Sequence, residues 1–189
     1  MMRDAVDAQA GCVEGQHESP VLSLSACARL HSVHKLTLRS IASLRGMLVA
    51  TGVSFPRLQS LHLLLQGCSA IEDPADYQAI ASTACVLTEL SKRLPASATA
   101  VPQQMAALLS ECSKLRGLAI LGGSRLVDVG ALSAGTQLQR LTIVRCSALS
   151  DMAPLGTMVN LQSLSMWACS AVPDLSPLAA LVKLQSLIT

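Results

Sequence analysis

One spacing constrains the fold of this chain more than any other feature: apolar residues recur every 23 positions in its C-terminal part. The leucines form two series, Leu115, Leu138, Leu161 and Leu184, then Leu118, Leu141, Leu164 and Leu187. Residues 138–160 and 161–183 are identical at 10 of 23 positions. Such a period is typical of a repeat architecture, in which each unit buries its apolar side only by stacking on its neighbours.

Each unit reads L-x-x-L-x-I/M-x-x-C/G-x-x-L/V-x-D-x-x-P/A-L. The alternation at its start predicts a short strand, and strands stacked about 4.8 Å apart would align equivalent leucines in buried rows. The aspartate of each unit is a good N-cap for a short helical turn, because its side chain accepts hydrogen bonds from free backbone N–H groups. A row of carboxylates for a cation is the alternative, which needs more assumptions. These residues are Asp128, Asp151 and Asp174.

This unit resembles those of the leucine-rich repeat superfamily. Its cysteine and D-x-x-P-L pattern is similar to the 23-residue repeats of leucine-rich repeat proteins in parasitic protozoa. The resemblance covers 115–189, as three regular units and a truncated fourth. It implies an α/β solenoid that is curved, with short parallel strands on the concave face and short helical turns and loops on the convex face. It also implies that Cys146 and Cys169 bond backbone groups of the loop after each strand.

The pattern loosens upstream, where 21–114 are predicted to form degenerate repeats with helical insertions. Units begin at Val33, Leu58 and Leu87, and the last of these leaves room for a convex helix. The residues of 74–94 and of 102–112 have helical composition, whereas 95–101 is predicted to be a loop. The polar segment 1–20, with one basic and four acidic residues, is predicted to be a disordered tail.

Composition excludes several classes of protein. The chain has 189 residues, of which 51% are apolar, 14% charged and 2% aromatic, and its net charge is +2. This length suits one domain, and so apolar a chain is not disordered throughout. No run approaches the roughly 20 apolar residues of a membrane-spanning helix. The small net charge does not favour a nucleic-acid partner.

The cysteines number seven, with no CxxC pair, and the N-terminus shows no secretory signal. Free thiols in the cytoplasm are therefore expected. A disulfide between Cys146 and Cys169 is geometrically possible, but buried structural thiols are the simpler interpretation. The cluster Cys27-x3-His31-x2-His34 offers three ligands without a matching second half, so no metal is expected. No phosphate loop or nucleophile elbow occurs, so we expect neither an enzyme nor a cofactor.

The repeat register assigns the residues that face solvent between the leucines. Five bases (Lys35, Arg39, Arg93, Arg140 and Arg145) stand there against one acid, Glu89, which would favour an acidic protein partner. Trp167 is the only tryptophan, beside Val144 and Arg145, and Trp and Arg are common binding hot spots. Scattered surface charge and a Trp packed flat on Val144 are the alternatives. The predicted partner-binding residues are Lys35, Arg39, His62, Arg140, Thr142, Val144, Arg145, Ser163, Ser165 and Trp167.

The function predicted from these observations is a non-catalytic protein-interaction module. One alternative is a substrate-recognition adaptor of a ubiquitin-ligase-like complex, although 1–32 show no clear three-helix pattern. Another is a surface recognition protein that lacks its signal sequence. The sequence stops at Thr189, inside the strand of the fourth unit, so we expect either a fragment or an apolar C-terminal edge covered by self-association.

Overall fold

A computed structural model describes most of the chain. The described ranges are 5–9, 33–39, 56–63, 74–83, 86–171 and 174–189. Most of the tail 1–20, Cys27 and His31 lie outside them, so the predictions made for these residues are not tested. The side chain of Arg39 is likewise outside the described part.

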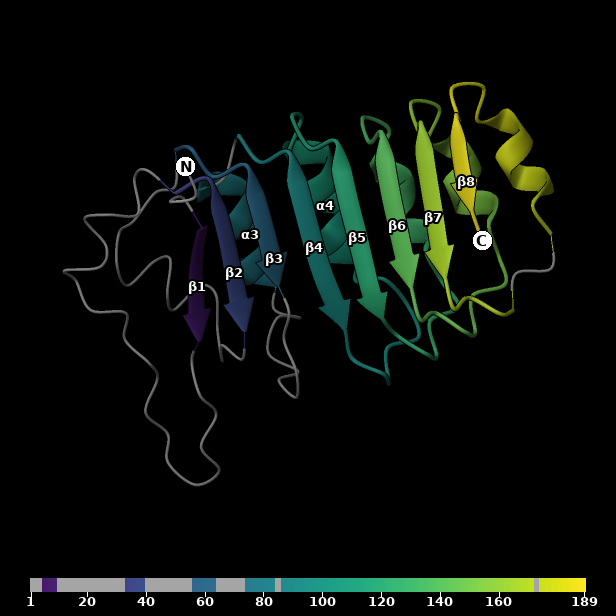
Figure 1. Ribbon diagram of the computed structural model, residues 1–189, viewed down its shortest axis with the longest axis horizontal. Helices are drawn as coiled ribbons and strands as arrows, with labels where there is room; N and C mark the ends of the chain where they lie inside the picture. Colours follow the sequence, from purple (N-terminus) through teal and green to yellow (C-terminus); the bar gives the residue numbers. More distant parts are fainter. Residues whose placement is uncertain (1–4, 10–32, 40–55, 64–73, 84–85, 172–173) are drawn as a thin grey trace.

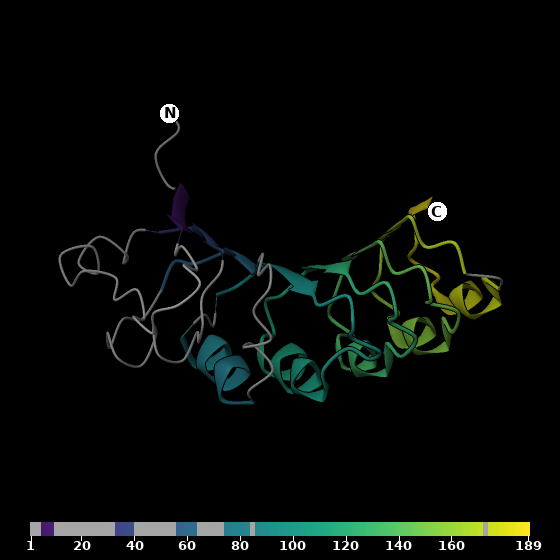
Figure 2. The ribbon, with the colours of Figure 1, turned by 90° about the horizontal axis from the view of Figure 1, so that it is seen from below.

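The described strands form one parallel sheet, and each strand pairs with the next one along the chain (Figure 1). The strands are β1 (Ala5–Gln9), β2 (Lys35–Arg39), β3 (Ser60–Leu63), β4 (Glu89–Leu94), β5 (Gly117–Gly122), β6 (Arg140–Val144), β7 (Ser163–Trp167) and β8 (Ser186–Ile188). The crossovers described between β4 and β8 lie on one side of the sheet, which curves around the opposite, concave face (Figure 2). This is the predicted α/β solenoid of the leucine-rich repeat type.

The helices cover the convex face. They are α3 (Pro74–Thr83), α4 (Gln103–Glu111) and the 3-10 turns η2 (Gly130–Ala134), η3 (Ala153–Thr157) and η4 (Ser176–Ala180). Strand starts are 23 residues apart from β5 to β8, but β4 begins 28 residues before β5 and 29 after β3. The longer units carry the α-helices, which take up the additional residues without disturbing the register of the sheet.

Two sequence predictions need correction. The helix expected over 74–94 ends at Thr83, and Glu89–Leu94 form β4. Leu90 and Leu94 satisfy a helical period, but pairing with both β3 and β5 decides in favour of a strand. Within the tail expected to be disordered, Ala5–Gln9 form β1, where Val6 and Ala8 occupy the register positions of Leu36 and Leu38. An unpaired edge of β2 accepts such a segment, because its backbone N–H and C=O groups need partners.

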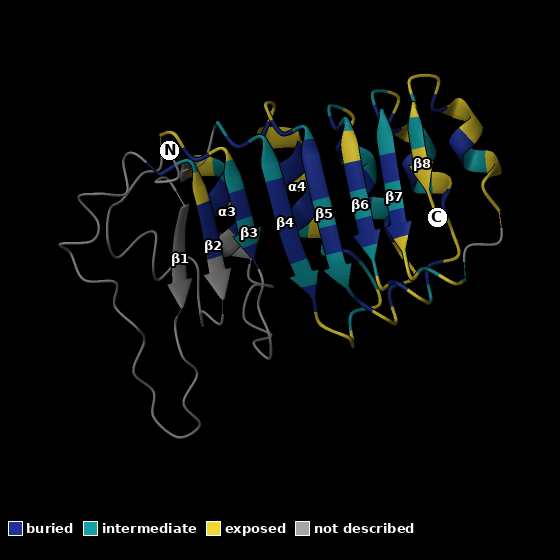
Figure 3. Ribbon diagram, viewed as in Figure 1, coloured by how far each residue is buried: buried dark blue, intermediate teal, exposed yellow. Residues whose placement is uncertain are grey.

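The core consists of rows of aliphatic side chains that run across the strands. Leu115, Leu138 and Leu161 are fully buried, as are Ile120 and Ile143. Buried residues follow the central strands, while many exposed residues lie in the loops at both ends of the strands (Figure 3). Each repeat therefore contributes one layer, and its apolar side chains are covered only when the neighbouring layers are present.

We expect Leu138→Ala to lower the free energy of unfolding by about 2–4 kcal/mol, because it leaves a cavity in a fully buried row. Urea denaturation followed by far-ultraviolet circular dichroism measures this loss. Val182→Ala is the matched control, since Val182 is 85% exposed and the change should stay within about 0.5 kcal/mol. Equal losses in the two variants would contradict the layered core.

Candidate functional site

The outward side chains of the strands form three rows on the concave face, at the first, third and fifth strand positions. The register aligns Arg140 with Ser163, Thr142 with Ser165, and Val144 with Trp167. On the other side of β5, Lys35 aligns with Ser60, and Thr37 aligns with His62. The predicted site residues lie on the strands, except Arg145, which directly follows β6. The rows determine which of them are neighbours.

The first row contains an ion pair between residues of two strands. Arg140 on β6 donates from Nη2 to Oε1 of Glu89 on β4, across the intervening strand β5. The two side chains meet over Gly117, whose missing side chain leaves the space: a Cβ there would overlap the Glu89 carboxyl group. The side chains of Arg140 and Glu89 remain 61% and 40% exposed. Arg140, expected to be a free base for a partner, is therefore already neutralised within the chain.

The third row is made of small side chains. Ser91 is buried, and Ala119, Thr142 and Ser165 are half-buried at the same register position of β5, β6 and β7. The hydroxyls of Ser91, Thr142 and Ser165 make no hydrogen bond within the described part of the chain. Since two of these residues are partly open to solvent, their hydroxyls can donate to or accept from an approaching ligand.

On β3 the third row carries a histidine in place of a small side chain. His62 is half-buried, and its Nε2 lies 3.0 Å from Oγ of Ser60 on the same strand. Ser163 occupies the first row beside Arg140 and is also half-buried. These two predicted site residues lie well apart, with three strands between β3 and β7.

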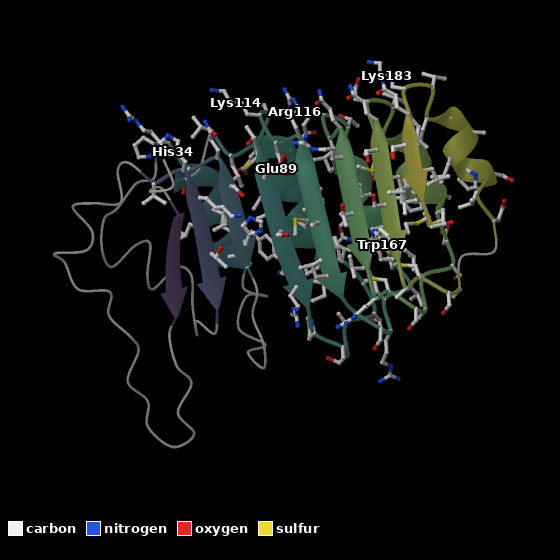
Figure 4. The ribbon with its side chains drawn as sticks, viewed as in Figure 1. His34, Glu89, Lys114, Arg116, Trp167 and Lys183 are labelled. Carbon is white, nitrogen blue, oxygen red and sulfur yellow. The ribbon has the colours of Figure 1, made fainter. Side chains whose placement is uncertain are left out.

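The fifth row holds the largest exposed side chain of this face. Trp167 is 55% exposed and ends β7 beside the half-buried Val144 of β6. Leu121 and Arg93 continue the row on β5 and β4. More than half of the Trp167 surface is therefore open to solvent. Glu89 and Trp167 lie near opposite ends of the strands (Figure 4).

Arg145 is exposed and follows Val144 in a left-handed backbone conformation, with φ of 60°. Its backbone N–H donates to the Trp167 carbonyl at 2.8 Å. The equivalent residues Gly122 and Ala168 have φ of 80° and 56°, so the turn itself requires this conformation. The turn anchors Arg145 next to the exposed tryptophan.

The predicted basic strip is narrower than the sequence suggests. Arg140 is paired with Glu89, and the Arg39 side chain is not described. Lys35 and Arg145 are exposed, while Arg93 is half-buried with its Nε lacking an acceptor among the described residues. The positive charge therefore concentrates at Arg93 and Arg145 around the fifth row, with Lys35 farther along the sheet.

Two cysteine thiols lie against backbone carbonyl groups of the preceding unit. Cys146 and Cys169 carry free thiols. The Cys146 thiol donates to the Gly122 carbonyl at 2.8 Å, in the turn of the preceding unit. The Cys169 thiol lies 3.7 Å from the Ile143 carbonyl. Burial, with a smaller contribution from the neighbouring Cys169, raises the pKa of Cys146 to about 12. The thiol is thus a neutral structural donor.

The aspartates hold the turns of the convex face, one residue earlier than a standard N-cap. Oδ1 of Asp128, Asp151 and Asp174 accepts the backbone N–H of Gly130, Ala153 and Ser176, respectively. Each donating N–H belongs to the first residue of a 3-10 turn. Hydrogen bonds from the Ser176 side chain and backbone lower the pKa of Asp174. Within the described ranges no cluster of three metal-ligating side chains occurs.

Sequence reasoning missed a buried lysine. Lys92 is 3% exposed and stands in an inward row of β4, between Leu63 and Ile120 of the adjacent strands. Its Nζ donates to the hydroxyl of the buried Tyr77 on α3 and lies 4.3 Å from the centre of that ring. A lysine at a position where other units have leucine, isoleucine or methionine was the available signal. The contact joins the sheet to the convex helix.

No helix in the described part of the chain is long and apolar enough to cross a membrane. At the far end of the sheet, Leu187 and Ile188 of β8 are 42% and 40% exposed. Self-association through this edge stays a prediction.

Comparison with known proteins identifies no family for this chain. No family model matches the sequence, and no curated protein matches it significantly. Among solved structures, the chain is similar to an internalin from Listeria monocytogenes, at 18% sequence identity and a TM-score of 0.33. The alignment covers 85% of this chain and 62% of the internalin. The fold assignment rests on the repeat and the strand register, and the finer likeness to protozoan repeats stays a prediction.

We expect a double-mutant cycle of Glu89→Gln and Arg140→Gln to give a coupling energy of about 0.2–1 kcal/mol, as for other exposed ion pairs. In a Gly117→Ala background the coupling should fall to near zero, because the added Cβ occupies the space of the Glu89 carboxyl group. Urea unfolding of the eight proteins measures both cycles. An unchanged coupling in the alanine background would show that Gly117 is not needed for the pair.

The raised pKa of Cys146 predicts a loss of stability in alkali. The folded state keeps the thiol proton up to about pH 12, whereas the unfolded thiol loses it near 9. The contribution of this thiol to the free energy of unfolding is therefore fully present below pH 9. Above pH 9 it declines by at most about 1.4 kcal/mol per pH unit. Urea unfolding between pH 7 and 10 should show this added slope in the wild type and not in Cys146→Ala. Parallel curves above pH 9 would contradict it.

Proposed function

We propose that the chain is a non-catalytic protein-interaction module that binds a partner on the concave face of the solenoid. The observation that carries this proposal is the 55% exposure of Trp167, beside Val144 and Arg145, in a chain with one tryptophan. A large aromatic side chain left in water gains free energy when a partner covers it, and Trp and Arg dominate binding hot spots. Rigid strands hold these side chains in place before a partner arrives.

The partner is expected to be acidic where it meets the fifth row. Arg93 and Arg145 make no ion pair within the described residues, whereas Glu89, the acid of the first row, is engaged by Arg140. Complementary charge would mainly raise the association rate and fix the orientation of the complex. Free thiols at Cys146 and Cys169 agree with a cytoplasmic protein, which is part of the proposal.

We expect Trp167→Ser to abolish capture of a discrete set of proteins from a native lysate, as a hot-spot loss of 2 kcal/mol or more weakens binding about 30-fold or more. Quantitative mass spectrometry compares the captured proteins with those of the wild type. Val182→Ser, which alters an exposed apolar residue in the loop between η4 and β8, is the matched control and should retain them.

Both variants must first show the wild-type circular-dichroism melt. Identical protein lists for Trp167→Ser and wild type would exclude the concave face as the binding site. Turnover of a small substrate by the purified protein, abolished by a concave-face substitution, would overturn the non-catalytic assignment.

A further inference from the structure

The concave face is not uniform between β4 and β7, and its differences indicate what it can bind. The first row carries the Glu89–Arg140 pair, the third row carries small hydroxyl and methyl groups, and the fifth row carries Arg93, Leu121, Val144 and Trp167. Small side chains thus lie between two rows of longer ones. A ligand that follows the third row runs across the strands, with the ion pair on one side and the apolar and basic row on the other.

We propose that this strip binds an extended, acidic and apolar peptide segment of another protein, which lies along the third row across β4 to β7. The inference rests on the proposed function and specifies its ligand. The strip is defined by Ser91, Ala119, Thr142, Ser165, Arg93, Leu121, Val144, Trp167 and Arg145.

The third row suits the main chain of such a segment. The hydroxyls of Ser91, Thr142 and Ser165 have no hydrogen-bond partner in the described part of the chain. An extended peptide exposes backbone N–H and C=O groups that need partners, and a hydroxyl can serve either. Four strands at about 4.8 Å spacing span roughly 14 Å, which is the length of about four extended residues.

The fifth row suits alternating side chains of the same segment. Leu121, Val144 and Trp167 stand on consecutive strands and offer an apolar surface. At the β4 end of the row, the Arg93 side chain lies close to Gly122, where an added Cβ would lie 3.8 Å from Arg93 Cγ. At the other end, the exposed Arg145 is bonded through its backbone to the Trp167 carbonyl. Bases flanking an apolar stretch complement carboxylates flanking apolar side chains.

The ion pair explains why the ligand would occupy this half of the face. The pair of Glu89 with Arg140 across Gly117 carries no net charge, so the first row offers no net attraction to a carboxylate. The carboxylates of Asp128, Asp151 and Asp174 lie beyond the strands and accept hydrogen bonds from the convex turns. Positive charge without an internal partner is thus left beside the fifth row.

The test selects displayed random 12-residue peptides on the intact wild-type chain. Peptides containing Asp or Glu next to Leu, Ile, Phe or Trp should be enriched. A synthetic copy of the strongest peptide is then titrated while the emission of Trp167, the only tryptophan, is recorded. Burial of Trp167 should shift the emission to shorter wavelength, and raising NaCl from 50 to 500 mM should weaken binding.

The variants Arg93→Gln and Arg145→Gln should each weaken binding of this peptide about tenfold. Lys114→Gln is the matched control and should leave the affinity unchanged. Lys114 is an exposed base near the opposite ends of the strands from Trp167 (Figure 4). All three substitutions are on side chains outside the core, and circular dichroism confirms that each variant is folded.

The outcomes separate this inference from the proposed function. Enrichment of neutral or basic peptides that lose binding on Trp167→Ser would overturn the acidic ligand while retaining the concave face as the site. Peptides indifferent to Trp167→Ser, Arg93→Gln and Arg145→Gln would overturn both. Selection of no peptide would overturn the extended segment, and the lysate comparison would still judge the proposed function.

Discussion

The structure depends on one constraint: parallel strands paired in a fixed register place the residues of each equivalent strand position at the same height in every layer. Leu118, Leu141 and Leu164 are aligned by backbone pairing, and all three are buried. A shift by one residue in one strand would turn its leucines to solvent and break every row that it crosses. The same constraint orders the outward residues into rows, so any surface this fold offers to a partner is a product of the register that builds its core.

Loops of unequal length are compatible with this register because each turn is held by its own hydrogen bonds. After β6, the chain turns at Arg145 and then buries Cys146, whose thiol donates to the Gly122 carbonyl of the previous unit. Farther along, the Asp151 carboxylate accepts the N–H that begins η3. Neither bond depends on the number of residues on the convex face. The α-helices of the longer units can therefore replace 3-10 turns while the strands remain aligned.

The strand register was predictable from sequence because a 23-residue period leaves a single way to superpose the leucines. Individual side-chain contacts were not predictable, because they depend on which side chains reach across a strand or to a convex helix. Glu89 and Arg140 are 51 residues apart and meet only because Gly117 leaves the space between them. Lys92 stands in an apolar row because Tyr77 offers it a hydroxyl and a ring. The helical period over 74–94 gave a wrong prediction for Glu89–Leu94, because pairing with strands on both sides outweighs the local helical pattern.

The backbone at Arg145 adds an argument about the fifth row. A left-handed conformation costs an L-residue about 1–2 kcal/mol, and glycine, as at position 122, avoids this cost. The turn is already fixed by Arg145 N–H on the Trp167 carbonyl and by the Cys146 thiol, neither of which uses the arginine side chain. The guanidinium has no ion-pair partner in the described chain. Ala168 takes the same left-handed conformation in the next unit, so the turn requires the strain whatever side chain it carries. At Arg145 the turn therefore fixes the backbone of an exposed basic residue directly after the strand position that pairs with Trp167.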